Sequence, residues 1–535
     1  MKKISGLLLL GCSALALAGC GADDIPPPGA GSITINNPSP TPSPTPTPGT
    51  GTVVAAASCP TFNATGGLTD SGTISGPEGT WRVCTLPALV DKSSSLPKVA
   101  GVLYRLNGRV DVGCDGGFSA PTAAAPFTTT TASCNGKSLT ADTDVTLTID
   151  PGVIVYGENG AEPAWLAVNR GNKISAVGTA SAPIIFTSRQ NVVGTNDDNS
   201  QGQWGGVVLL GRGIVTDCNY GSTTANTCER DTEGSVNKAV FGGRDNAYNA
   251  GTMKYVQVRY SGYVLSNGKE LQSLTAEGVG TGTTLDFFQS VNSSDDGAEF
   301  FGGAVNFKHY IAVNADDDSL DIDTGLQGNF QYGLLLQRSG AGDAMVEADS
   351  TGAEDQLPRQ KTNIANFTMI QPVSSSNNES NDKASLLIRG NADITLVNDV
   401  IVSPNNECLR LTPPNVAGAS PATLKAFATV MTCNSAKYIT DAGYTGSDAA
   451  TQFATGTNGN NDALTSTLTS TFVNGTNESA VAGYASIATL SSFFTATTYI
   501  GAVKDAADTW YKGWTCDNAT GQFGSGKTCT TLPTT

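Results

Sequence analysis

Apolar and polar residues alternate along this chain in short runs that end at glycine, asparagine or proline. Examples of such runs are residues 145–149, 153–156, 165–168, 183–187 and 207–210. Runs this short predict β-strands, and their close spacing leaves no room for the helices of alternating strand and helix units. The pattern therefore predicts an all-β chain, which a sandwich, a propeller or a β-helix would each satisfy.

A repeat of 22 residues decides among these folds. Residues 285–292 align with residues 307–314, and the same offset places residues 295–299 over residues 317–321. Two or three strands per turn of 22 residues, with like residues superposed, predict a parallel β-helix. A propeller blade would need a period of about 40 to 50 residues.

The repeat extends in both directions along the chain. Residues 330–337 continue it with one extra residue, and residues 253–258 begin it before an insertion at 263–272. Leu387 and Leu409 are again 22 residues apart. We therefore expect an N-terminal cap with the first coils, a β-helix body and a C-terminal cap, over residues 53–140, 141–435 and 436–535 respectively.

Six segments also carry a family resemblance. They are residues 149–157, 161–167, 176–188, 203–207, 255–260 and 295–303, of which the last reads Asp-Asp-Gly-Ala-Glu-Phe-Phe-Gly-Gly. These segments resemble right-handed parallel β-helix outer-membrane lipoproteins of Gram-negative bacteria, which are mostly uncharacterised and often occur beside TonB-dependent receptors. The resemblance implies an all-β right-handed parallel β-helix with an outer-membrane receptor as a partner, and it implies no particular activity.

The N-terminus has the composition of an export signal. Lys2 and Lys3 precede an apolar run at residues 7–17 and the sequence Leu-Ala-Gly-Cys, which ends at Cys20. This order predicts a secretory signal peptide over residues 1–19. The ending resembles the lipobox, whose cysteine is acylated and becomes the first mature residue, and Gly21 favours the outer membrane by resemblance to the lipoprotein sorting rule. An ordinary signal peptide with a chance cysteine is the alternative.

Residues 20–52 are predicted to form a tether. Proline alternates with serine or threonine at residues 38–48, and such a sequence builds neither a helix nor a ladder of strands. It extends as polyproline II at about 3.1 Å per residue, so it would hold the folded body away from the lipid.

The charge balance limits the partners of the chain. The sequence has 47 acidic and 30 basic residues, with a formal net charge of −17. Such a surface repels nucleic acid and anionic lipid, which excludes a function in nucleic-acid binding. The same surface attracts cations.

Ten of the twelve cysteines remain after Cys12 is removed with the signal peptide and Cys20 is acylated. They fall into close couples with 10 to 25 residues between the members, and the couples themselves are farther apart. Disulfides between nearest neighbours are the simplest expectation in an oxidising compartment, although the sequence alone does not fix the pairing. The expected couples are Cys59 with Cys84, Cys114 with Cys134, Cys218 with Cys228, Cys408 with Cys433, and Cys516 with Cys529.

Carboxylates recur with the repeat. At the offset of 22, Glu277, Glu299 and Asp321 superpose and point out of the coil, about 4.8 Å apart. Like charges at that distance repel by about 1 kcal/mol in water, so they invite a hard cation with oxygen ligands. We predict a Ca²⁺ site here, and a hydrated acidic face without a specific site is the alternative. The remaining predicted ligands, all next to this ladder, are Asp295, Asp296, Asp317 and Asp318.

Three function classes follow. The first is a non-enzymatic envelope lipoprotein that presents its β-helix to a glycan or a protein partner. The second is a calcium-dependent polysaccharide lyase, for which Lys308, Arg259 and Arg338 are candidate bases by register. The third is a structural envelope protein without a small ligand. Polygalacturonase-type hydrolysis is disfavoured because the Gly-His-Gly and Arg-Ile-Lys motifs of those enzymes do not occur in the sequence.

Two further motifs are interpreted as structural. His309, the single histidine, superposes on Phe287 and is predicted to stack on it. Residues 521–528 match the P-loop pattern, but they lie between Cys516 and Cys529, where no strand and helix are expected to flank them. We interpret that match as coincidence.

Overall fold

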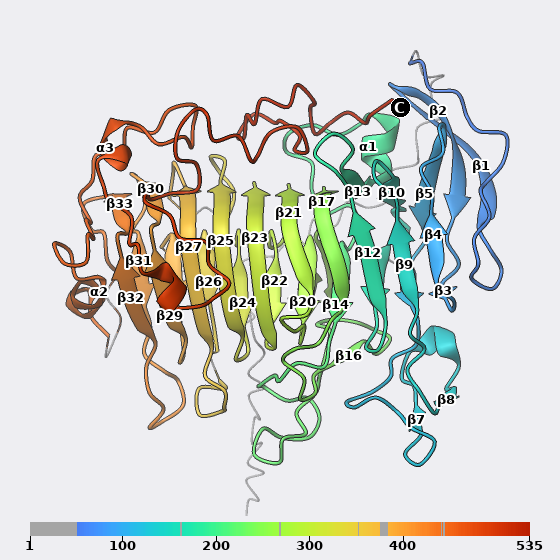
Figure 1. Cartoon of the computed structure of the whole chain (residues 1–535), viewed down its shortest axis with the longest axis horizontal. Coiled ribbons are helices and arrows are strands. Elements are labelled where there is room, and N and C mark those ends of the chain that lie inside the picture. Colours follow the sequence, from blue (N-terminus) through green and yellow to red (C-terminus); the bar gives the residue numbers. More distant parts are fainter. Residues whose placement is uncertain are drawn as a thin grey trace, which may run out of the picture.

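In the part of the chain that this computed structural model describes, ten short strands stack in parallel into one sheet along the length of the molecule (Figure 1). The described residues are 51–534 except 161–162, 267–268, 351, 375–383, 440 and 442–443. The strands of this ten-stranded sheet, in order, are β3 (Leu89–Val90), β6 (Arg109–Val112), β11 (Trp165–Val168), β14 (Val207–Leu210), β20 (Leu274–Glu277), β22 (Glu299–Phe301), β24 (Asp321–Asp323), β26 (Val346–Ala348), β28 (Leu386–Ile388) and β31 (Leu409–Leu411).

A second sheet of seventeen strands bends into two arms. Five long strands run through both arms, namely β17 (Gly251–Arg259), β21 (Thr284–Val291), β23 (Ala304–Val313), β25 (Gln327–Leu336) and β27 (Lys361–Ile370). Each of them bends at one residue in the left-handed region, with φ between 52° and 65°, and these residues are Tyr255, Phe287, His309, Tyr332 and Asn366. The bend turns one strand from the first arm into the second.

Before and after the long strands, each arm has separate short strands. The first arm is built from β4 (Ser94–Leu96), β9 (Thr146–Ile149), β12 (Lys173–Val177), β29 (Asp393–Val397) and β32 (Thr423–Phe427). The second arm is built from β1 (Thr69–Gly76), β2 (Gly79–Thr85), β5 (Val102–Leu106), β10 (Ile154–Gly157), β13 (Ile184–Ser188), β30 (Val400–Ser403) and β33 (Val430–Cys433).

The two arms and the ten-stranded sheet enclose a single apolar core, so the fold is the predicted all-β parallel β-helix. Leu285 pairs with Phe307 at the predicted offset of 22, and Phe307 pairs with Phe330 after one extra residue, as expected. The predicted pairing of Leu387 with Leu409 is wrong by one residue, because Leu387 pairs with Arg410.

The two ends of the β-helix differ. At the N-terminal end β1 and β2 form an antiparallel hairpin, and β2 continues in parallel with β5. At the other end α2 (Gly446–Phe453) packs against β31 and β32. The β1–β2 hairpin and α2 thus cover strand edges that would otherwise be open to pairing with other chains.

The last part of the chain does more than cap one end. Residues 471–534, which we call the C-terminal strap, contain α3 (Thr476–Ser479) and η2 (Ile487–Thr489). The strap runs back along the outside of the β-helix from the end near α2 to the first coils, as the dark red chain in Figure 1 shows. It ends at the β1–β2 turn, where the Leu532 amide donates to Glu78 Oε1 at 3.1 Å.

All five predicted disulfides are present among the described residues. The predicted stacking of His309 is also confirmed, since its ring lies 4.1 Å from the Phe287 ring and 5.0 Å from the Tyr332 ring, centroid to centroid. Residues 521–528 form turns inside the loop closed by the Cys516–Cys529 disulfide, without the flanking strand and helix of a P-loop.

The signal peptide, Cys20 and most of the predicted tether lie outside the described residues. Within the described residues, no helix has the length and apolar character needed to cross a bilayer.

Candidate functional site

An insertion between β14 and β17 covers the outer face of the ten-stranded sheet. We call residues 211–250 the covering lobe; it contains the hairpin of β15 (Arg230–Asp231) and β16 (Val240–Phe241) and the Cys218–Cys228 disulfide. The Gly303 amide donates to the Ile214 carbonyl at 2.7 Å, and the Arg230 guanidinium lies 5.3 Å from the centre of the Phe301 ring. The lobe therefore rests directly on β22 and the turn that follows it.

Three small pieces complete the surroundings of this face. The hairpin of β18 (Tyr263–Ser266) and β19 (Lys269–Leu271) follows β17. Near the N-terminal coils lie the hairpin of β7 (Phe127–Thr128) and β8 (Ser138–Leu139) and the short helix η1 (Ala132–Cys134). The helix α1 (Arg189–Val193) lies elsewhere, against β1 and β13.

Two of the three predicted ladder carboxylates stack, and the third does not. Glu299 pairs with Asp321 on the next coil, as predicted, and Asp321 pairs with Glu347 on the coil after that. Glu277 instead pairs with Phe301, while Thr275 lies beside Glu299. The prediction for Glu277 is wrong because the turn after β20 has two more residues than the turn after β22, which makes the offset 24 here and not 22.

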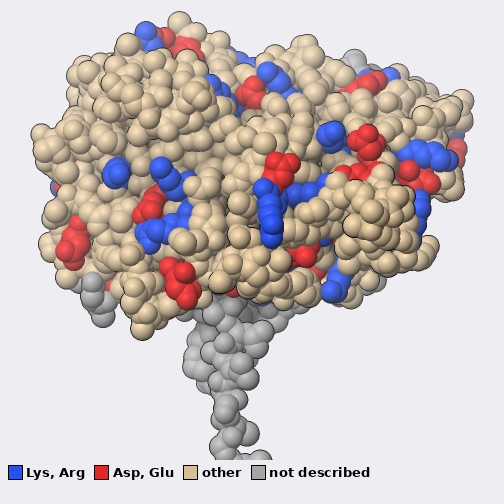
Figure 2. Space-filling model, turned by 60° about the horizontal axis from the view of Figure 1, so that its bottom comes forward, with Lys and Arg blue, Asp and Glu red and all other residues tan. Residues whose placement is uncertain are grey.

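The predicted outward direction of these carboxylates holds relative to the coil, but they are not on the surface. Glu299 and Asp321 are each 4% exposed, because the covering lobe and neighbouring turns enclose them. The acidic groups that do reach the face shown in Figure 2 are scattered among lysine and arginine side chains. The expectation of a shallow acidic face is therefore replaced by a buried row of carboxylates.

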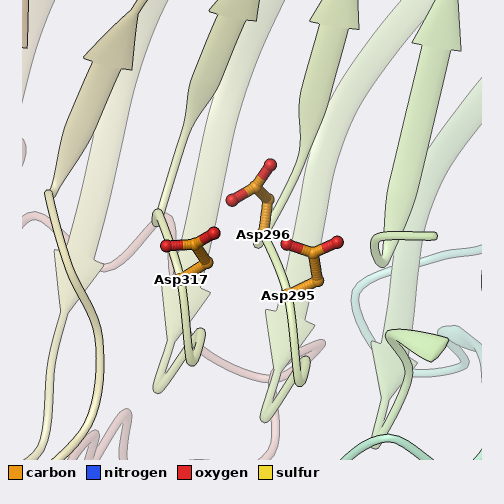
Figure 3. A group of neighbouring side chains, drawn as sticks. All are labelled: Asp295, Asp296 and Asp317. Atoms are coloured by element: carbon orange, nitrogen blue, oxygen red, sulfur yellow. The ribbon is translucent and has the colours of Figure 1, made fainter. Parts of the chain in front are cut away.

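Two groups of three carboxylates lie close enough to share an ion. Asp295, Asp296 and Asp317 each offer an oxygen within 4.8 Å of the others, and so do Asp296, Glu299 and Asp321. Figure 3 shows Asp295 and Asp296 projecting from the turn of one coil and Asp317 from the corresponding turn of the next. Asp296 belongs to both groups, so the two candidate sites are continuous.

Hydrogen bonds between neighbouring coils fix these turns. The Asp318 amide donates to Asp296 Oδ1 at 2.9 Å, and the Ala344 amide donates to Asp318 Oδ1 at 2.6 Å. Asp318, a predicted ligand, thus connects two turns and is absent from both groups of three. Gln272 Nε2 donates to Asp295 Oδ2 at 3.3 Å.

Burial and mutual repulsion set the electrostatics of the site. Burial raises the pKa of Asp296 well above its ordinary value, and the nearby Asp295, Asp321 and Asp317 raise it further. The pKa of Glu299 is raised for the same reasons, by burial first and then by Asp321 and Asp296. Among the described residues, no lysine or arginine forms an ion pair with any member of the two groups. The nearest ion pair along the row joins Arg389 to Glu347, at 2.8 Å.

Two other carboxyl groups border the row. Burial raises the pKa of Glu270, on β19, to about 7, and raises the pKa of Glu277 to about 8. Thr232 of the covering lobe donates to Glu277 Oε2 at 2.6 Å. Sequence reasoning missed Glu270 and Glu347; the Val-Glu-Ala pattern of β26, which matches the apolar–acid–apolar pattern of residues 298–300, would have indicated Glu347.

The donor set suits calcium. Oxygen ligands of Ca²⁺ lie at 2.3–2.6 Å from the ion, so two of them are at most about 5 Å apart. Both groups of three meet that limit with carboxylate oxygens alone. A divalent cation would also remove the repulsion that raises the pKa values.

The candidate bases for lyase chemistry do not gather at this row. Arg259 Nη1 donates to the carbonyls of Cys529 and Thr531 in the strap, each at 2.8 Å, and Lys308 Nζ donates to Thr495 Oγ1 in the strap at 2.9 Å. Arg338 donates to Gln201, whose amide in turn binds Asp316. Only Arg338 approaches the carboxylates, and it does so through a glutamine.

Comparison with known proteins gives one family. The family model described as a pectate-lyase-like β-helix domain matches residues 128–515. No curated protein and no solved structure matches the chain. The matched residues include the ten-stranded sheet from β11 to β31 and both groups of carboxylates.

Proposed function

The chain belongs to the family of the pectate-lyase-like β-helix domain, and from this premise we propose that it is a cell-envelope lipoprotein whose calcium-stabilised β-helix binds polysaccharide. The family supports a role connected with carbohydrate. The lipid anchor rests on the sequence around Cys20, and the outer-membrane location rests on Gly21. A neighbouring outer-membrane receptor is the partner that the resemblance to envelope lipoproteins implies.

One observation carries the calcium part of this proposal. Asp295, Asp296 and Asp317 converge from two adjacent coils, and Asp296 continues the group to Glu299 and Asp321. These side chains are largely buried, and no basic side chain among the described residues neutralises them. Removing one carboxylate from water is costly, and a row of them is stable when it is protonated or binds a cation.

Thermal unfolding of the mature chain at constant ionic strength tests the calcium site. We expect Ca²⁺ to raise the free energy of unfolding by about 2.7 kcal/mol at a hundredfold excess over its dissociation constant. Mg²⁺ should do less, because it gives up its waters reluctantly. Glu299→Gln should reduce the calcium response, and Asp355→Asn, at an exposed position, is the matched control. Equal responses to both ions, or an unchanged response in Glu299→Gln, would show simple charge screening.

A binding screen against purified polysaccharides tests the rest. The same samples should be followed for unsaturated products, which a lyase releases by β-elimination. We expect retention of a polysaccharide without product formation, since the candidate bases Lys308 and Arg259 are engaged by the strap. Product formation that requires Ca²⁺ would establish the lyase alternative instead.

A further inference from the structure

A separate pocket opens on the outer face of the ten-stranded sheet, nearer the N-terminal coils. Its volume is about 570 Å³, which is within the range of small-molecule sites. It lies over β6 and β11, and its walls come from three separate parts of the chain: η1, the covering lobe and β18. We propose that this pocket binds one or two neutral sugar units of the polysaccharide. This inference rests on the proposed function and adds the chemical class of the ligand.

The floor of the pocket is built from interlocked side chains. The Arg109 guanidinium lies 4.6 Å from the centre of the Trp165 ring and donates to the Asn237 carbonyl of the covering lobe at 2.8 Å. Asp111 accepts from Arg109 Nε at 2.8 Å and from Ser133 Oγ at 2.7 Å. The floor is thus held in place before any ligand arrives, which reduces the entropy lost on binding.

The charges of the pocket cancel. Arg109 and Asp111 are the charged residues in its lining, and they form an ion pair at 2.7 Å. A ligand with a carboxylate would find no unpaired cation in the described lining, and a cationic ligand would find no unpaired anion. The pocket therefore favours a neutral polar ligand, in contrast to the acidic polysaccharide that the family name brings to mind.

The rim supplies the two kinds of contact that a neutral sugar needs. The side-chain amides of Asn107 and Asn237 are exposed and form no hydrogen bond with other described residues, so they are available to hydroxyl groups. Val236 is 85% exposed beside them, and Leu265 and Pro163 complete an apolar wall. An apolar side chain this exposed gains from contact with the carbon-bound hydrogens of a sugar ring.

The pocket is distinct from the carboxylate row. Asp111 and Glu299 belong to one register row on the outer face, but Ala167, Val208 and Thr275 lie between them. Four strand spacings amount to about 19 Å. A variant in the pocket therefore leaves the predicted calcium ligands intact.

Calorimetric titration of the mature chain in calcium tests the proposal with cellobiose, xylobiose, mannobiose and digalacturonate as probes. We expect at least one neutral disaccharide to bind and digalacturonate not to bind. Val236→Trp, which fills the mouth, and the double variant Asn107→Ala with Asn237→Ala should each weaken that binding tenfold or more. Val54→Trp, at a position 81% exposed outside the pocket lining, is the control. Melting curves verify that each variant folds.

The outcomes separate this proposal from the proposed function. Absence of neutral-disaccharide binding, binding that both pocket variants leave unchanged, or binding of digalacturonate that Val236→Trp abolishes would each overturn the neutral-sugar pocket. If a polysaccharide binds Val236→Trp as tightly as the wild type, glycan binding stands and its site is elsewhere. If no polysaccharide binds the wild type, both proposals fail.

Discussion

The carboxyl group of Glu277 lies fully buried between β20 and the covering lobe, with Thr232 donating to one of its oxygens. Burial is the largest cause of its raised pKa, which is about 8, and the nearby Arg230 opposes the rise only in part. The folded protein therefore keeps this proton at a pH where the unfolded chain, with an ordinary pKa of 4.5, has lost it.

This difference makes stability depend on pH. Between about pH 5 and 8 the folded state binds more protons than the unfolded state, so the free energy of unfolding falls as pH rises. In EDTA we expect Glu277 to contribute up to about 1.4 kcal/mol per pH unit to that fall. Chemical unfolding of Glu277→Gln across this range should give a shallower slope than the wild type, and Asp355→Asn should keep the wild-type slope. Identical slopes for Glu277→Gln and the wild type would contradict the prediction.

At the residue scale, the sequence indicated which acids matter better than where they lie. Glu299 and Asp321 stack as predicted because their coils have equal turns. Glu277 does not, because a longer turn at residues 278–283 shifts the register by two residues and moves its neighbour from Glu299 to Phe301. The burial of the row could not be predicted, because it depends on an insertion whose docking leaves no periodic signal.

At the element scale, the long bent strands bind the strap through their glutamines. Gln289 Nε2 donates to the Cys516 carbonyl at 3.0 Å, and its Oε1 accepts from the Cys516 amide at 2.9 Å. Gln331 exchanges the same two bonds with Thr495, at 2.7 and 2.9 Å. Each amide side chain thus pairs with the strap backbone as a neighbouring strand would.

We therefore expect the double variant Gln289→Met with Gln331→Met to loosen the strap and leave the coils folded. Each substitution leaves a backbone amide and carbonyl of the strap without partners, at a cost of about 1–3 kcal/mol per buried group. Limited proteolysis followed by mass spectrometry should show faster cleavage within residues 490–520. Gln190→Met, on α1, is the control. Cleavage of the double variant at the wild-type rate would show that apolar packing alone holds the strap.

The coils themselves were predictable because their signal is local. Phe288 and Tyr310 superpose at the offset of 22, and the apolar residues around them repeat with the same period. The strap has no such repeat, and the contact of Arg259 with Cys529 joins residues 270 positions apart. Its path follows from tertiary contacts with the αL bends and the glutamines, which no period in residues 436–535 reveals.

At the scale of the whole molecule, the proposed location depends on one residue. We expect Cys20→Ala to move the protein from the membrane fraction to the soluble fraction, because the predicted anchor is the lipid on that cysteine. The melting temperature should stay unchanged, since the described body begins after the tether. Fractionation with immunodetection measures the first effect and circular dichroism the second. A variant that stays in the membrane fraction would mean that another segment anchors the chain.

The meeting of both ends of the folded body at one turn has a mechanical consequence. The Val53 amide donates to the Glu78 carbonyl at 2.9 Å, and the side chain of the same Glu78 accepts from the Leu532 amide. A pull arriving through the residues before Gly51 would load the β1–β2 hairpin and the end of the strap together. The strap in turn is bonded to coils along the β-helix through Gln289 and Gln331. The load would therefore be distributed over many coils in shear, and the first coil would not peel away alone.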